Sequence, residues 1–95
     1  MYNSIKLNLY TQDDCPYCFI MKKKLTEWGY DFFEINISYD LDKKKFLKEE
    51  GHRTVPQVYW NRTHLNKVNT EDFTQEVLEA EIDYEKYQGG VENFA

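Results

Sequence analysis

The sequence predicts a single α/β domain, and two observations carry this prediction. The chain has 95 residues, the length of one small domain. Near its start, an alternating apolar run, an amphipathic run and a second apolar run follow one another within about thirty residues, the pattern of a strand–helix–strand unit. We expect its two strands to be parallel and its connection to be right-handed.

The periodicity of the side chains defines these first three elements. Apolar and polar residues alternate over residues 5–10, which predicts a strand. From Pro16 onwards apolar residues recur at helical spacing, and Gly29 is a suitable residue to end that helix. Residues 30–37 are rich in aromatic and β-branched side chains, which predicts the second strand.

The next segments predict a helix and a hairpin. Residues 40–50 are polar and lysine-rich with a narrow apolar face, so they indicate a helix that Asp40 caps and Gly51 ends. Residues 55–60 predict a strand opened by a proline, and residues 64–68 predict the strand that returns from a short turn.

The last predicted helix begins at Thr70, a good N-cap, with acidic residues 71 and 72 in its first turn. It completes a domain over residues 1–82. Residues 83–95 are expected to form a C-terminal tail, in which one short helix ends at the glycines 89–90 and packs on the same domain.

Composition and charge exclude several classes of protein. With 12 basic and 17 acidic residues, the net charge of −5 argues against nucleic acid as a main partner, because phosphate binding needs a basic face. No apolar stretch is long enough for a membrane span, and the first residues do not resemble a signal peptide. The two cysteines are too few for a secreted disulfide scaffold, so we expect a cytoplasmic protein.

The most informative stretch is Cys15-Pro16-Tyr17-Cys18, at the passage from the first strand to the first helix. Residues three apart on a helix have Cβ atoms about 5–6 Å apart, which is close to disulfide range. Pro16 suits the first helical position, where a missing N–H costs nothing. The free amides and partial positive charge of a helix N-terminus favour a thiolate. This pattern predicts a thiol–disulfide exchange site.

A metal site is the main alternative for two cysteines at this spacing. A structural zinc site needs four ligands, and the only other soft ligands are His52 and His64. They lie much farther apart than the about three to five residues that separate zinc-finger histidines. The placement of the pair after a strand and the proline between the cysteines favour redox chemistry, and we expect no metal.

A second signal is Thr54-Val55-Pro56, which opens the third predicted strand. A cis Val55–Pro56 peptide would make a tight, rigid bend. Pro56 has no N–H, so it can face a reactive sulfur without a competing donor, and the backbone of Val55 would then pair with an extended peptide. The alternative is an ordinary strand-opening proline, which the neighbouring cysteine pair disfavours.

C-P-Y-C after the first strand and T-V-P-Q at residues 54–57 together resemble the glutaredoxin family of the thioredoxin superfamily, over residues 5–80. The resemblance implies a thioredoxin-like fold of order βαβαββα, with a four-stranded mixed sheet flanked by helices. It also implies a monomer that reduces protein disulfides and glutathione mixed disulfides. Glutathione would be the reductant and co-substrate, with no cofactor bound permanently.

The resemblance assigns roles to the two cysteines. Cys15 would attack a glutathione mixed disulfide, take the glutathione and be released by a second glutathione. With a protein disulfide, Cys18 would resolve the mixed disulfide and leave the pair oxidised. The implied partners are glutathionylated or disulfide-containing proteins, with ribonucleotide reductase as one candidate.

The resemblance also implies a glutathione site. Family members hold glutathione as an extra strand beside the T-V-P segment, with its glutamyl carboxylate at the start of a later helix. Three features depart from the usual pattern: Gln12 replaces a lysine, Asn66-Lys67 replaces a Gly-Gly pair, and the segment from there to the last helix is slightly longer. For Gln12, Arg53 and Lys67, plain surface polarity is the competing interpretation. The candidate residues are Gln12, Tyr17, Arg53, Thr54, Val55, Pro56, Lys67, Thr70 and Glu71, with Pro16 as active-site support.

Two rival functions remain open at this point. One is a protein-disulfide reductase that a thioredoxin-type reductase regenerates, which the unusual residues at positions 12, 66 and 67 keep open. The other is a module that holds an iron–sulfur cluster between two subunits. Pro16 disfavours the cluster because it stiffens the loop between the cysteines.

Overall fold

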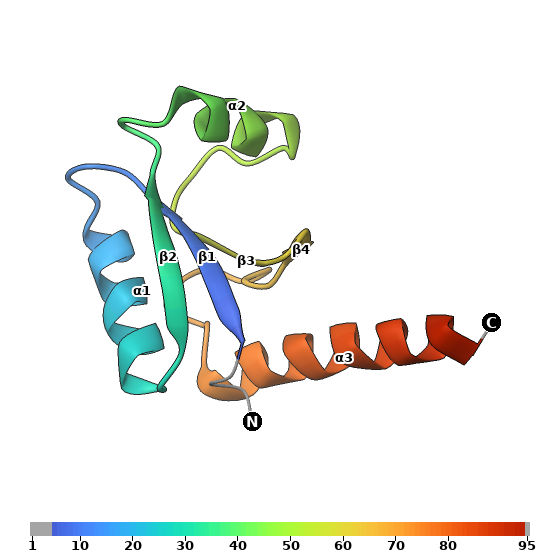
Figure 1. Ribbon diagram of the computed structural model, residues 1–95. Coiled ribbons are helices and arrows are strands. Elements are labelled where there is room, and N and C mark those ends of the chain that lie inside the picture. Colours follow the sequence, from blue (N-terminus) through green and yellow to red (C-terminus); the bar gives the residue numbers. More distant parts are fainter. Residues whose placement is uncertain (1–4, 95) are drawn as a thin grey trace.

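The structure is a computed structural model that describes the backbone of residues 5–94 and the side chains of residues 5–87. In chain order its elements are β1 (Lys6–Thr11), α1 (Pro16–Glu27), β2 (Asp31–Asn36), α2 (Leu41–Glu49), β3 (Gln57–Trp60), β4 (Thr63–His64) and α3 (Gln75–Phe94) (Figure 1). The predicted order of strands and helices is confirmed. The side chains at the end of the predicted tail lie outside the described residues.

The four strands form one mixed sheet in the order β2-β1-β3-β4. β1 and β2 are parallel, with Lys6 opposite Asp31 and Thr11 opposite Asn36. β3 runs antiparallel to β1, and β4 runs antiparallel to β3. The predicted parallel pair and the mixed sheet are therefore present. β1 lies between β2 and β3, and the loop that leads to the cysteines follows its C-terminal end.

Helices cover both faces of this sheet because alternate residues of a strand point to opposite faces. Leu7 and Leu9 of β1 lie in a core that α1 and α3 complete. Tyr10 points to the other face, where it packs with Leu47 of α2 and edge-on against Tyr59 of β3. The cysteine helix α1 thus lies on one face, and α2 lies on the other.

The ends of α1 and α2 follow the predicted capping residues. Asp40 is the N-cap of α2, and its Oδ1 accepts a hydrogen bond from the backbone N–H of Lys43 at 3.1 Å. Gly29 and Gly51 follow the two helices with φ of 83° and 89°, the left-handed conformation that terminates helices and that glycine adopts without steric cost.

The returning strand of the hairpin is shorter than predicted and lies earlier in the chain. We expected residues 64–68, whereas β4 contains only Thr63 and His64. Beyond it, the backbone N–H of Leu65 still donates to Val58, at 2.9 Å, but the next contact comes from the side chain of Asn66. A side chain therefore replaces the strand ladder there. The preceding strand is also shorter, because β3 begins at Gln57, after the proline.

The last helix begins later than predicted. Thr70 is not its N-cap: residues 70–72 form a turn and α3 starts at Gln75. Thr74 takes the capping role, because its Oγ1 accepts a hydrogen bond from the N–H of Val77 at 3.2 Å. The turn is stabilised by Asn69, whose Oδ1 accepts from the N–H of Asp72 at 2.8 Å.

α3 also continues through the expected boundary after residue 82 and past the glycines 89–90, instead of ending before a separate short helix. A glycine inside a helix costs only about 1 kcal/mol relative to alanine, so it does not have to end one. Figure 1 shows the C-terminal part of α3 extending beyond the sheet. Within the described residues, no helix is both long enough and apolar enough to span a membrane.

Candidate active site

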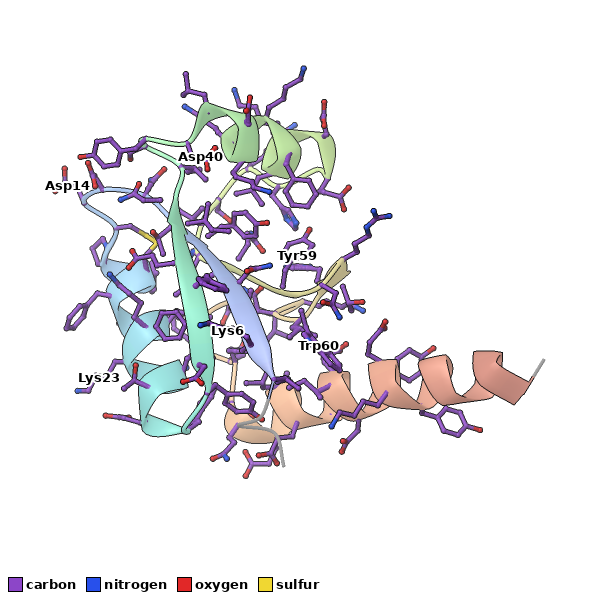
Figure 2. All side chains as sticks on the ribbon, viewed as in Figure 1. Lys6, Asp14, Lys23, Asp40, Tyr59 and Trp60 are labelled. Atoms are coloured by element: carbon purple, nitrogen blue, oxygen red, sulfur yellow. A yellow bond between two sulfur atoms is a disulfide. The ribbon has the colours of Figure 1, made fainter. Side chains whose placement is uncertain are left out.

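Cys15 and Cys18 are joined by a disulfide at the N-terminal end of α1, with their Cα atoms 5.2 Å apart (Figure 2). Cys15 is the N-cap of the helix, and its Sγ accepts a hydrogen bond from the backbone N–H of Cys18 at 3.2 Å. Cys15 is partly exposed, whereas Cys18 is only 2% exposed. Cys15 is therefore the more accessible of the two cysteines, and it lies at a helix N-terminus, which favours a thiolate over a thiol.

The predicted Thr54-Val55-Pro56 segment faces this disulfide. The Val55–Pro56 peptide bond is cis, and the carbonyl oxygen of Val55 lies 3.8 Å from Cys15 Sγ. Pro56 is buried and cannot donate a hydrogen bond to the sulfur. Residues 40 positions apart in the chain are thus brought together at the sulfur of Cys15.

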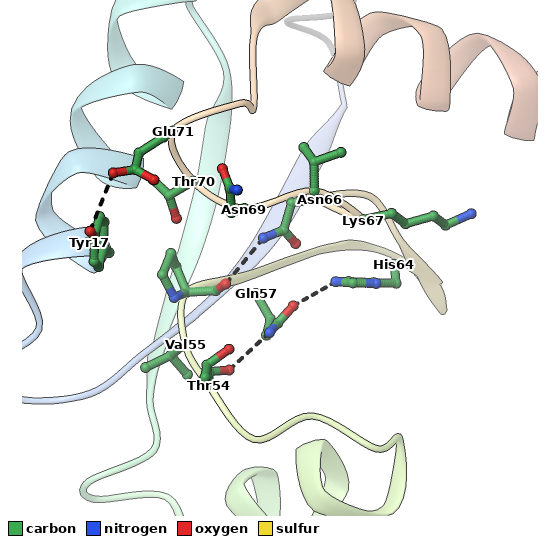
Figure 3. A pocket seen from close by; sticks show the side chains of 12 residues that line it. Tyr17, Thr54, Val55, Gln57, His64, Asn66, Lys67, Asn69, Thr70 and Glu71 are labelled. Carbon is green, nitrogen blue, oxygen red and sulfur yellow. Dashed lines mark hydrogen bonds between the residues drawn. The ribbon is translucent and has the colours of Figure 1, made fainter.

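Two buried side-chain amides stand on either side of this segment (Figure 3). Gln57 donates from Nε2 to the carbonyl oxygen of Thr54 at 2.9 Å. Asn66 donates from Nδ2 to the carbonyl oxygen of Pro56 at 3.1 Å. The carbonyls before and after Val55 are both held, while the carbonyl of Val55 faces the sulfur.

A pocket of about 540 Å³ adjoins the segment (Figure 3). The hydroxyl group of Tyr17 donates across it to Oε2 of Glu71 at 3.4 Å, and the carboxylate of Glu81 pairs with Nζ of Lys67 at 3.5 Å. The ammonium group of Lys67 is therefore already engaged. The lining includes seven of the predicted glutathione-binding residues, namely Tyr17, Thr54, Val55, Pro56, Lys67, Thr70 and Glu71.

The remaining two predicted residues, Gln12 and Arg53, line a second pocket of about 290 Å³. This pocket contains Lys44 and Lys48 of α2 and no carboxylate. It shares Thr54 and Val55 with the first pocket. The predicted site is therefore divided between two pockets that meet beside Cys15, and the second one is cationic.

Asp13, two residues before Cys15, is held by side chains at the end of β2 and in the loop that follows it. The carboxylate of Asp13 accepts hydrogen bonds from the hydroxyl of Tyr39 at 2.6 Å and from Nδ2 of Asn36 at 2.9 Å. These hydrogen bonds, that from Tyr39 first, hold the pKa of the Asp13 carboxyl below its usual value. The charge is thereby fixed towards the loop after β2.

Two histidines lie between the pockets. The rings of His52 and His64 have centroids 4.5 Å apart, and Nε2 of His64 is 2.6 Å from Oε1 of Gln57. Burial, and then the nearby His52, hold the pKa of His64 below its ordinary value. Among the described residues, no group of three or more His, Cys, Asp or Glu side chains is arranged to hold a metal ion.

Several residues of the site were not found from the sequence. Gln57 and His64 had no assigned role, and Asn66 was noted only as a departure from a family pattern. Lys24 of α1 was also missed: its Nζ donates to the carbonyl oxygens of Thr70 at 2.6 Å and Phe73 at 2.8 Å. The acceptors in these contacts are mostly backbone atoms, which cannot be identified from the sequence. The only available signal is a polar side chain in an otherwise apolar region.

Comparison with known proteins agrees with this geometry. The family model described as Glutaredoxin matches residues 7–65. Glutaredoxin 3 of Escherichia coli (strain K12) is 33% identical over 60 residues, which cover 62% of this chain and 72% of that protein. The glutaredoxin-like protein NrdH of the same organism is 30% identical over 54 residues, which cover 57% of this chain and 67% of that protein.

Solved structures show the same likeness. The NrdH-redoxin of Escherichia coli, described as having a thioredoxin-like activity profile, superposes with a TM-score of 0.60 at 27% identity, covering 63% of this chain and 79% of that one. Wheat glutaredoxin has a TM-score of 0.57 at 27% identity, covering 75% and 68%. Together with the Cys15–Cys18 pair and the cis-proline segment that faces it, these matches show that the chain belongs to the glutaredoxin family, whose members are thiol–disulfide oxidoreductases.

Proposed function

We propose that this protein is a dithiol glutaredoxin of the C-P-Y-C type that uses glutathione to reduce protein disulfides and glutathione mixed disulfides. The observation that carries the proposal is the position of the Val55 carbonyl, 3.8 Å from Cys15 Sγ at the junction of two pockets. If a short extended peptide is attached through its sulfur to Cys15, its backbone can pair with the backbone of Val55. The two pockets then provide space for the residues on either side of that sulfur.

The exchange with a glutathione mixed disulfide proceeds in two displacements. The Cys15 thiolate attacks the glutathione sulfur, a Cys15–glutathione disulfide forms, and the substrate thiol leaves as a thiolate that takes a proton from water. A second glutathione thiolate then attacks the glutathione sulfur on Cys15. Oxidised glutathione leaves and the Cys15 thiolate is restored, so one free glutathione is consumed, and the glutathione of the mixed disulfide forms the other half of the oxidised glutathione.

A protein disulfide requires both cysteines. Cys15 attacks one sulfur of the substrate and releases the other as a thiolate. Cys18, which lies one helical turn away and is buried, then attacks Cys15 and releases the second substrate thiolate. The Cys15–Cys18 disulfide remains, and two glutathione molecules reduce it. Glutaredoxin potentials of about −200 to −230 mV lie near the glutathione poise, so this last step is feasible.

The two pockets suit the two ends of glutathione. Arg53, with Gln12 beside it, is the candidate partner of the glycine carboxylate in the cationic pocket. Tyr17 is the candidate contact of the glutathione sulfur, and the backbone around Thr70 and Glu71 is the candidate partner of the glutamyl group. A structure of buckwheat glutaredoxin with glutathione matches this chain with a TM-score of 0.57 at 26% identity, which supports the proposal for the related fold.

A second candidate function is a disulfide reductase regenerated by a thioredoxin-type reductase. Three observations favour it: Gln12 is uncharged, Lys67 is paired with Glu81, and the NrdH-redoxin structure superposes well. In either case we propose a monomer that acts in the cytoplasm, without a permanently bound cofactor, on glutathionylated or disulfide-containing proteins. The likeness to NrdH supports ribonucleotide reductase as one candidate substrate.

The reductant decides between the two functions. The purified protein is supplied with a protein disulfide substrate and NADPH, either with glutathione and glutathione reductase or with thioredoxin reductase alone, and NADPH oxidation is followed. We expect turnover with glutathione and little with thioredoxin reductase. The Cys15→Ser variant gives the background in both assays. Turnover that occurs only with thioredoxin reductase would show that the second function is correct.

A further inference from the structure

Asn66 takes the place of a strand at the edge of the active-site segment. β4 ends at His64, so no backbone of that strand lies opposite the start of β3. The carboxamide of Asn66 fills this position: Oδ1 accepts from the N–H of Val58 at 2.7 Å, and Nδ2 donates to the carbonyl oxygen of Pro56 at 3.1 Å. The residue is 6% exposed, and both halves of its amide are used.

These two hydrogen bonds hold the residues on both sides of Gln57 and fix the direction of the chain as it enters β3. On the other side of the cis peptide, the carbonyl oxygen of Thr54 accepts from Gln57, whose Oε1 contacts His64. The carbonyl of Val55, between the two held carbonyls, is the one that faces Cys15.

We infer that Asn66 is a positioning residue for disulfide exchange, because its carboxamide holds Pro56 and Val58 and thereby keeps the backbone of Val55 in place opposite Cys15. It acts through Val55 and does not touch the reacting sulfur. The inference rests on exchange at Cys15 but not on the identity of the reductant. The carboxamide carries a donor and an acceptor on one planar group, and these two contacts use both.

The test separates positioning from simple stabilisation of the fold. Asn66→Asp and Asn66→Ala are compared with wild type in a single reaction of the reduced protein with a glutathionylated cysteine peptide, so no recycling reductant is needed. Gln75→Ala is the matched control, because it removes an amide that donates to Glu79 at 2.9 Å on α3, outside both pockets. Circular dichroism and thermal unfolding establish that each variant is folded at the assay temperature.

We expect both Asn66 variants to exchange about tenfold more slowly, because the loss of a buried hydrogen bond leaves the Pro56 carbonyl free to move. Gln75→Ala should match wild type. Alkylation of Cys15 by iodoacetamide, measured in a Cys18→Ser background, should change little, because this small electrophile needs no backbone partner. Equal losses in exchange and alkylation, or no loss of exchange, would overturn the inference.

The Asn66→Asp variant adds a pH signature. An ionised carboxylate accepts from Val58 but cannot donate to Pro56, whereas a protonated carboxyl can do both, as the amide does. The exchange rate of Asn66→Asp, divided by that of wild type at the same pH, should therefore rise as the pH is lowered, and that of Asn66→Ala should not.

Other titratable groups surround this position, and Asn66→Ala controls for them because it removes the same amide without adding a carboxyl; they are His52, His64, Lys67, Glu71 and Glu81. Parallel ratios for the two variants would show that the donor to Pro56 is irrelevant. If one variant fails to fold, the other decides, because each loses the donor. A wild-type protein that does not exchange at all would instead refute the proposed function.

Discussion

The ammonium group of Lys24 donates a hydrogen bond to the carbonyl oxygen of Thr70 at 2.6 Å, and a second one to Phe73 at 2.8 Å. Lys24 lies two turns beyond Cys18 on the same helix. The helix that presents the cysteines is therefore tied directly to the turn that lines the larger pocket. Both acceptors are backbone atoms, so on the α1 side these two hydrogen bonds depend on the side chain of Lys24.

Replacing Lys24 with methionine should loosen this turn. Hydrogen bonds from charged groups contribute about 1.5–3 kcal/mol, so we expect the free energy of unfolding to fall by about 2 kcal/mol. The KM for glutathione should rise more than kcat falls, because the lining of the pocket is affected and the sulfur is not. Urea unfolding and steady-state kinetics measure the two effects. Lys23→Met, at an exposed neighbouring position, is the control, and an equal effect there would contradict the role of Lys24.

The two cysteines should differ sharply in their effects. Cys15→Ser removes the accessible sulfur and should abolish all exchange. Cys18→Ser should retain the reduction of a glutathione mixed disulfide but lose the reduction of protein disulfides, because no second thiol resolves the intermediate. Both reactions are followed through coupled NADPH oxidation. Substantial activity of Cys15→Ser would reverse the assignment of the two roles.

Arg53 provides a test of the cationic pocket. If it pairs with the glycine carboxylate of glutathione, Arg53→Ala should raise the KM for glutathione about tenfold, the size expected for a charge-assisted contact. Arg62→Ala, in the exposed turn between β3 and β4, is the matched control. Gln12→Lys should act in the opposite direction and lower the KM. An unchanged KM in both pocket variants would identify Gln12 and Arg53 as ordinary surface residues.

The stability of the protein should decrease in mild acid because of His64. Its pKa in the folded state lies below the value of about 6.5 for an exposed histidine, owing to burial and then to His52. The unfolded chain therefore binds the proton more readily, and the free energy of unfolding falls as the pH drops below about 6.5. Urea titrations at a series of pH values should show this slope in wild type and a smaller one in His64→Gln. Identical slopes would exclude His64 as the cause.

Much of the fold could be predicted because it depends on the periodicity of apolar residues and on residues that begin or end helices. The alternation in β1, the glycines after α1 and α2 and the Asp40 cap all act locally. The start of α3 could not be predicted in the same way. Thr70 and Thr74 are both suitable caps with a glutamate within the next two residues, and the ammonium group that donates to the carbonyl of Thr70 belongs to a distant helix.

Some features of the candidate site could likewise be predicted from the sequence, and others could not. The cysteines and the proline segment were predictable because their chemistry is a property of the residues themselves. The division of the predicted binding residues between two pockets, and the engagement of Lys67 by Glu81, were not. Asn66 was noticed only as an unusual residue. Its hydrogen bonds to the start of β3 are possible because β4 ends two residues earlier, which the sequence did not indicate.

The meeting of the two pockets at Thr54 and Val55 makes the site directional. A chain that crosses Cys15 has one end beside Lys44, Lys48 and Arg53, with which no carboxylate in the described part of the protein forms an ion pair. Its other end lies beside Glu71 and an already paired lysine. The forward and reversed orientations of one peptide are therefore not equivalent, and we expect the protein to discriminate between the two sides of a substrate disulfide before any bond is exchanged.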